Sequence, residues 1–144
     1  MVKEVRGKQL EKQIDQLIKW IDSLGYHGHK NHPKRLNDGK YIEGEPFDYE
    51  IFLPTYKCCF DAKECKSATW SLENAKPHQI DYLKKCKNSG LDSFFLVYFF
   101  KFHSLIKFDV DTVIKCLSND IHSLSPDDGD KWSEIYDFKN KGKY

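Results

Sequence analysis

Residues 93–100, with the sequence Ser-Phe-Phe-Leu-Val-Tyr-Phe-Phe, restrict the possible fold more than any other stretch of the chain. The run is too short for a helix of a bundle, and its aromatic and β-branched residues favour a strand. An apolar run without polar alternation is typical of a strand buried on both faces. We therefore expect a central strand, with residues 103–108 as its neighbour and the aromatic side chains as the core of the sheet. An exposed member of this group could instead stack on an unpaired base.

The residues before this run predict a helix, a hairpin and a second helix. Apolar residues at intervals of three and four predict an amphipathic helix that ends at Gly25. Residues 47–53 and 56–63 are rich in β-formers, and the Pro-Thr pair between them favours a tight connection. Pro77 then begins a short helix that continues to about Lys87.

The residues after the run predict one more helix and a turn. Asp109 or Asp111 can cap a helix with an apolar face, and residues 125–129 have the composition of a turn. Residues 139–144 are expected to be frayed. The predicted order is α-β-β-α-β-β-α, which indicates an α/β protein with helices beside a sheet.

The size and composition favour one soluble domain that spans residues 1–144. Hydrophobic residues make up 40% of the 144 residues and aromatic residues 15%, which excludes a disordered chain. No apolar stretch approaches the ~20 residues of a membrane helix, and the charged first residues do not resemble a signal peptide. Five cysteines, two of them adjacent, suit reduced thiols. We expect a cytoplasmic protein without membrane contact, with the cysteines as core residues rather than zinc ligands.

The charges are segregated along the chain, although the formal net charge is only +1. Residues 1–41 and 54–107 each carry nine basic and five acidic side chains, whereas residues 109–138 carry two basic and eight acidic ones. The basic parts favour a polyanionic partner. Because the chain has only two arginines, contacts with phosphates are more plausible than sequence-specific readout of bases.

Residues 26–45 contain four Gly or Pro residues, three histidines and no apolar period, which predicts a long loop. Loops of this length are often functional, and we expect residues 27–40 to contact a DNA backbone. The histidines of this loop, His27, His29 and His32, could alternatively bind a transition metal, although no partner ligand stands at a standard spacing.

Two acidic residues and a lysine mark the predicted hairpin. Asp48 lies near the start of its first strand and Asp61 near the end of its second strand, so the turn can bring the two carboxylates together. Lys63 shares a strand face with Asp61, because side chains alternate along a strand. Two carboxylates and a backbone carbonyl are ligands that Mg²⁺ prefers, and an ammonium group can stabilise charge on a reacting phosphate.

This arrangement resembles the motif of the PD-(D/E)xK nucleases, written here as Phe47-Asp48 followed by Asp61-Ala62-Lys63. With His78-Gln79 at the start of the next helix, it resembles the RecU-type Holliday junction resolvases and, more loosely, the archaeal Hjc resolvases. The run Arg6-Gly7-Lys8-Gln9-Leu10-Glu11 is similar to the start of the first helix in those families. The resemblance covers residues 6–117 and implies a restriction-endonuclease-like core, with a mixed sheet of about four strands flanked by helices.

The resemblance also implies roles for individual residues. Asp48 and Asp61 would bind Mg²⁺, for which Mn²⁺ can substitute, together with the Ala62 carbonyl and with help from Glu11 in the metal shell. Lys63 would position the attacking water, and Gln79 would complete the catalytic set at the edge of the site. DNA would be contacted by basic residues and one histidine around this site: Arg6, Lys8, Lys30, Lys34, Arg35, Lys66 and His78.

The implied activity is Mg²⁺-dependent cleavage of four-way DNA junctions in recombination and repair, by a homodimer that matches the two-fold symmetry of the substrate. A small enzyme of this kind would suit a phage and then act in the cytoplasm of the bacterial host. The chain departs from the family pattern where Asp61 replaces the usual Glu and where the stalk between the first helix and the Asp strand is shortened to residues 26–45. A restriction or repair nuclease acting on duplex or flap DNA remains an alternative, as does a catalytically silent DNA-binding protein.

Overall fold

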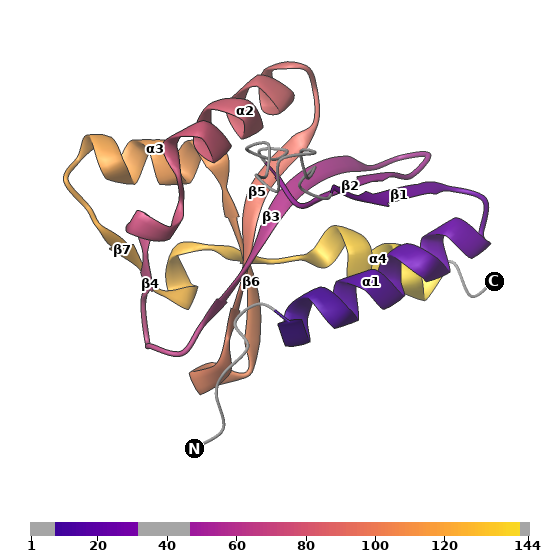
Figure 1. Ribbon diagram of the computed structural model, residues 1–144, viewed down its shortest axis with the longest axis horizontal. Helices are drawn as coiled ribbons and strands as arrows, with labels where there is room; N and C mark the ends of the chain where they lie inside the picture. Colours follow the sequence, from indigo (N-terminus) through magenta and orange to yellow (C-terminus); the bar gives the residue numbers. More distant parts are fainter. Residues whose placement is uncertain (1–7, 32–46, 142–144) are drawn as a thin grey trace, which may run out of the picture.

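The computed structural model describes residues 8–31 and 47–141, which form a central sheet with helices on both faces (Figure 1). Six strands of the described chain make up this sheet, in the order β1-β2-β3-β5-β6-β8. Strands β3 (Lys57–Cys65) and β5 (Asp92–Phe99) are parallel, and every other neighbouring pair is antiparallel. The expected mixed sheet flanked by helices, and with it the restriction-endonuclease-like class, is confirmed, although the described sheet has six strands rather than about four.

Strand β5 is the buried centre that the aromatic run predicts. It lies between β3 and the antiparallel strand β6 (Ser104–Asp109), so both of its edges are paired. Phe94 and Leu96 pack into the core on one face of the sheet, whereas Phe95 and Val97 pack into the core on the other. This alternation follows from the two-residue period of a strand.

Four helices cover the two faces within the described residues. Helices α1 (Lys8–Ser23) and α4 (Ser133–Lys141) lie on one face, where Trp20 packs against Phe138 with ring centroids 5.7 Å apart (Figure 1). Helices α2 (Pro77–Asn88) and α3 (Val110–Ser118) lie on the other. Asp109, one of the two predicted caps, is the residue that caps α3, since its carboxylate accepts a hydrogen bond from the amide of Asp111.

The short elements connect these layers. The predicted hairpin is present, with β2 (Tyr49–Phe52) antiparallel to β3. Strands β4 (Trp70–Ser71) and β7 (Ser123–Leu124) form a separate two-stranded sheet. Three 3₁₀ helices complete the described chain: η1 (Leu72–Asn74), η2 (Phe100–Phe102) and η3 (Pro126–Asp128). None of the described helices combines the length and the apolar character needed to cross a bilayer.

Two parts of the sequence-based prediction are wrong. The expected loop over residues 26–45 contains strand β1 (His27–Lys30), which pairs with β2, while residues 32–46 lie outside the described chain. Of the end expected to be frayed, residues 139–141 are helical and residues 142–144 lie outside the described chain, and β8 (Asp130–Lys131) precedes that helix. The sequence pattern does not predict the strand His-Gly-His-Lys, because it is an edge strand without a large apolar residue. Its Gly28 lies so close to α1 that an added Cβ would be 3.0 Å from Ile18.

A polar network attaches α4 to the sheet. Lys107 is buried on β6 and donates hydrogen bonds to Asp92 at 2.7 Å and to both carboxylate oxygens of Glu134 at 3.0 Å. The hydroxyl of Tyr56 donates to the same oxygen of Asp92, and the indole of Trp132 donates to that hydroxyl. A buried charge is tolerated when it is paired and hydrogen-bonded in this way.

Candidate active site

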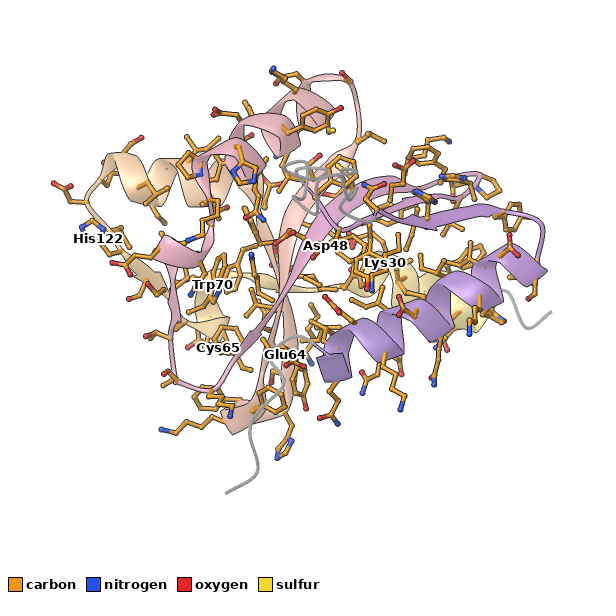
Figure 2. All side chains as sticks on the ribbon, viewed as in Figure 1. Lys30, Asp48, Glu64, Cys65, Trp70 and His122 are labelled. Atoms are coloured by element: carbon orange, nitrogen blue, oxygen red, sulfur yellow. The ribbon has the colours of Figure 1, made fainter. Side chains whose placement is uncertain are left out.

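The candidate site begins where β3 extends beyond the end of β2. Tyr49 is the first residue of β2 and pairs with Phe60, whereas β3 continues to Cys65 with β5 as its strand partner. Asp48 lies directly before β2, and its amide donates to the Phe60 carbonyl at 3.1 Å. Its carboxylate then accepts a hydrogen bond from the Ala62 amide at 2.9 Å. Asp48 therefore places a carboxylate at the open edge of β3 (Figure 2).

Asp61 and Lys63 come from this same extension of β3. Asp61 is 2% exposed, and the Lys63 ammonium lies 2.8 Å from its Oδ2 atom. The two groups form an ion pair, and apart from this ammonium Oδ2 has no hydrogen-bond donor among the described residues. The sheet thus brings Asp61, Lys63 and Asp48 to one place, with a buried carboxylate oxygen whose partner is the Lys63 ammonium.

The Asp61 carboxylate opposes the ionisation of Asp48. Burial and the neighbouring Asp61 carboxylate raise the pKa of Asp48 to about 7, although the Ala62 amide favours the ionised form. Two carboxylates close together in a poorly solvated place are stable only if a proton or a cation offsets their charge. This pattern is common at functional sites.

Glu11 reaches the same place from α1. Its carboxylate is 3.8 Å from the ammonium of Lys30, which is also 3.7 Å from Asp15. Burial raises the pKa of Glu11, and Lys30 opposes this shift. Gln79 lies in the first turn of α2, where its side-chain oxygen accepts the amide hydrogen of Lys76 at 3.1 Å.

All six residues expected from the resemblance to form the site line one pocket of about 520 Å³. The pocket also contains residues that the sequence did not indicate, mostly from the segment after β3. Its complete lining is Glu11, Asp48, Asp61, Ala62, Lys63, Glu64, Cys65, Lys66, Ser67, Thr69, Trp70, Ser71, Asn74, Gln79 and Phe100. Alternation along β3 predicts the shared face of Asp61 and Lys63, but no sequence signal places the polar segment around Ser67 beside them.

The sequence model of the recombination protein U family matches residues 5–139. The chain belongs to the recombination protein U family. This is a family of Holliday junction resolvases, and the match includes every element that forms the pocket. Comparison with curated proteins gives no match.

The predicted DNA contacts of this family member are only partly described. Lys66 lines the pocket and is exposed, and His78 is exposed at the start of α2. Lys30 is near the pocket, but its ammonium faces the acidic side chains of α1. Arg6, Lys34, Arg35 and the side chain of Lys8 lie outside the described residues.

The other candidate ligands stand apart from the recombination protein U site. His27 lies on β1, where its Nε2 atom is 3.0 Å from a carboxylate oxygen of Glu50, and His32 is outside the described residues. Cys58 and Cys59 are buried in the cores on opposite faces of the sheet, as their positions in a strand predict. The cysteines are free thiols in the described chain.

The donor set of the pocket fits a hard divalent cation. Asp48 and Asp61 offer carboxylate oxygens, and Oδ2 of Asp61 has no donor besides the Lys63 ammonium among the described residues. Because the N–H and C=O of one strand residue point to the same side, the Ala62 carbonyl faces the open edge with its amide. No group of three or more His, Cys, Asp or Glu side chains in the described chain is placed to hold a metal. Mg²⁺ nevertheless suits this site, because it is often held by one or two carboxylates and retains several waters.

Proposed function

We propose that this chain is a metal-dependent endonuclease that hydrolyses DNA phosphodiester bonds and cleaves four-way junctions in recombination. The observation that carries the proposal is the convergence of Asp48, Asp61 and Lys63 in one pocket, in a member of the recombination protein U family. A catalytically silent member would not need to keep Asp61 so close to Asp48 that its charge raises the pKa of Asp48.

Each residue then has a chemical task. Asp48, Asp61 and the carbonyl of Ala62 would hold Mg²⁺ or Mn²⁺, with Glu11 in contact through the metal shell. When bound, this ion neutralises charge on the phosphate and lowers the pKa of water. The ammonium of Lys63 orients the attacking water and stabilises charge that develops on the phosphate oxygens. Gln79 uses its oxygen on the Lys76 amide, which leaves its side-chain N–H groups as donors to a phosphate oxygen.

The junction assignment adds a requirement for two active sites. Two strands must be cut at positions related by the two-fold symmetry of the junction, so a homodimer with one pocket per subunit matches the symmetry of the substrate. The basic side chains around the pocket, Lys66 among them, would hold the backbone of the cleaved strand. Cleavage of duplex or flap DNA by the same site is the second candidate function, because the pocket chemistry alone does not select a branched substrate.

A cleavage assay on three substrates tests the proposal. A synthetic four-way junction, a duplex and a flap would be incubated with wild type, Asp61→Ala, Lys63→Ala and the control Lys115→Ala. Lys115 is an exposed lysine on α3 that does not line the pocket. We expect Mg²⁺-dependent paired nicks on the junction, lost in the first two variants and kept in the control.

The other outcomes separate the parts of the proposal. Equal cleavage of all three substrates would keep the catalytic site and reject junction selectivity. DNA binding without cleavage in either Mg²⁺ or Mn²⁺ would reject the nuclease and favour a silent DNA-binding protein. Light scattering of the protein with and without junction DNA would decide whether the active form is a dimer.

A further inference from the structure

Glu64 follows Lys63 on β3, but its side chain points to the opposite face of the strand from Asp61 and Lys63. There it meets the first turn of α1, where the amide of Leu10 donates a hydrogen bond of 2.9 Å to its Oε2 atom. Figure 2 shows Glu64 beside the start of this helix. The contact joins residues separated by 54 positions in the sequence.

This hydrogen bond satisfies a particular need of α1. The amides of the first turn have no partner within a helix, and Leu10 is buried, so water cannot readily replace the carboxylate. A negative charge at the start of a helix also interacts favourably with the helix dipole. Glu64 therefore fixes the first turn of the 16-residue helix to the strand that carries Asp61 and Lys63.

The residue that follows Leu10 is Glu11, which lines the pocket with Asp48 and Asp61. The Glu11 carboxylate is drawn toward β1 by Lys30, whose ammonium is 3.8 Å away. The backbone of the first turn of α1, however, is fixed by the hydrogen bond from the Leu10 amide to Glu64 of β3. The position of Glu11 relative to Asp61 thus depends on a contact made three residues further along the same strand.

We propose that Glu64 is a positioning residue for the DNA-cleaving site, which sets the place of Glu11 by binding the Leu10 amide. The inference rests on the proposed nuclease function and assigns Glu64 no contact with DNA or metal. The unit Asp61-Ala62-Lys63-Glu64 then supplies a carboxylate, a carbonyl and an ammonium to the site and an anchor for the helix that brings the third carboxylate.

The test is a double-mutant cycle between Glu64 and Glu11. Single-turnover cleavage rates and Mn²⁺ affinity would be measured for wild type, Glu64→Ala, Glu64→Gln, Glu11→Gln and the double variant Glu11→Gln/Glu64→Ala. We expect Glu64→Ala to lower the cleavage rate by about tenfold or more, with little change in KM for DNA, as for residues that orient metal ligands. Glu64→Gln keeps an acceptor for the Leu10 amide and should remain within about threefold of wild type. In the Glu11→Gln background, Glu64→Ala should cause no further loss, because the two residues act as a unit.

A stability control separates positioning from weaker packing of α1. Ile21→Val removes one methylene group from the buried far end of the helix, away from Glu11. Urea unfolding would report the stability of each variant. We expect Ile21→Val to lower the free energy of unfolding without lowering the cleavage rate. Glu64→Ala should lower the cleavage rate even where its loss of stability is no larger than that of Ile21→Val.

Three results would overturn the inference while leaving the nuclease intact. Equal losses for Glu64→Gln and Glu64→Ala would mean that the charge acts directly. Multiplicative effects of Glu64→Ala and Glu11→Gln would mean that the residues act independently. A loss of cleavage in Ile21→Val equal to that in Glu64→Ala would mean general destabilisation. If wild type neither cleaves DNA nor binds Mn²⁺, the proposed function itself fails, and the inference fails with it.

Discussion

Asp48 destabilises the metal-free fold in the ionised form that the proposed chemistry requires. Its pKa rises from an ordinary value of 3.8 to about 7, because it is buried beside Asp61. A carboxyl group with a raised pKa in the folded state contributes stability that is fully present below its unfolded pKa and is lost as the pH rises through its folded pKa. The metal-free protein should therefore lose stability from this group between about pH 4 and pH 7 and regain it when a cation binds.

Asp48→Asn should accordingly stabilise the metal-free protein at pH 8, by on the order of 1–3 kcal/mol. Asparagine keeps an oxygen for the Ala62 amide but carries no charge. Urea unfolding in EDTA at pH 8 and at pH 4.5 measures the difference, which should be small at the lower pH. Addition of Mg²⁺ should raise the melting temperature of wild type more than that of the variant. A variant that is less stable than wild type at pH 8 would contradict this account of the site.

Lys63 is expected to act on the reaction rather than on DNA binding. Because its ammonium faces Asp61 in the pocket, Lys63→Ala should lower the single-turnover cleavage rate by about 10²-fold or more, as for the loss of other groups that stabilise charge in a transition state. Its Kd for junction DNA in Ca²⁺ should change by less than about threefold. An equal loss in affinity and rate would instead indicate that Lys63 is mainly a phosphate contact.

At the scale of elements, the close contact between η3 and β6 gives a test of the fold away from the site. An added Cβ on Gly129 would be 2.5 Å from Ile106 and 2.7 Å from the backbone oxygen of Lys107. Because that oxygen belongs to a paired strand, the contact cannot be relieved by a side-chain rotation. Gly129→Ala should lower the free energy of unfolding by about 1–3 kcal/mol. Ser133→Ala, at the exposed start of α4, is the control, and equal stability of the two variants would show that η3 moves away freely.

The elements that the sequence predicts best are those with a strong apolar pattern. The buried strand β5 and the hairpin of β2 and β3 follow from composition and turn residues, and α1 follows from its period. Strand β1 and helix α4 cannot be predicted from a local sequence pattern, because the residues that stabilise them are distant in the sequence. The Lys107 network that holds Glu134 of α4 is an example, since a charged residue in a strand gives no sign of burial.

The same distinction applies to the site. The spacing of Asp48, Asp61 and Lys63 on a hairpin predicts their meeting, and the family resemblance adds Glu11 and Gln79, which line the same pocket. Neither the hairpin spacing nor the family resemblance predicts the role of Glu64, because a glutamate next to a lysine is usually a solvated side chain. Its hydrogen bond to Leu10 depends on how α1 crosses the sheet, which no local pattern determines.

At the scale of the whole molecule, the uneven charge distribution predicts which surface meets DNA. The acidic stretch of residues 109–138 includes α3 and the first part of α4, whereas the pocket is lined by lysines of the preceding basic stretch. Each contact between a basic side chain and a phosphate releases counterions from the DNA. The slope of log Kobs for DNA binding against log salt concentration therefore reports the number of phosphate contacts. Lys66→Ala should reduce this slope by about one, without changing the preference among sequences.

Asp127→Asn is the matched control, because it also changes one charge at an exposed position, but in the acidic segment. Fluorescence anisotropy with junction DNA in Ca²⁺, at several salt concentrations, measures both slopes. If DNA lies along the pocket, the control slope should equal that of wild type. A change of similar size in the salt slopes of both variants would mean that DNA binding depends on the net charge alone. Lys66 would then not be a specific contact of the DNA backbone.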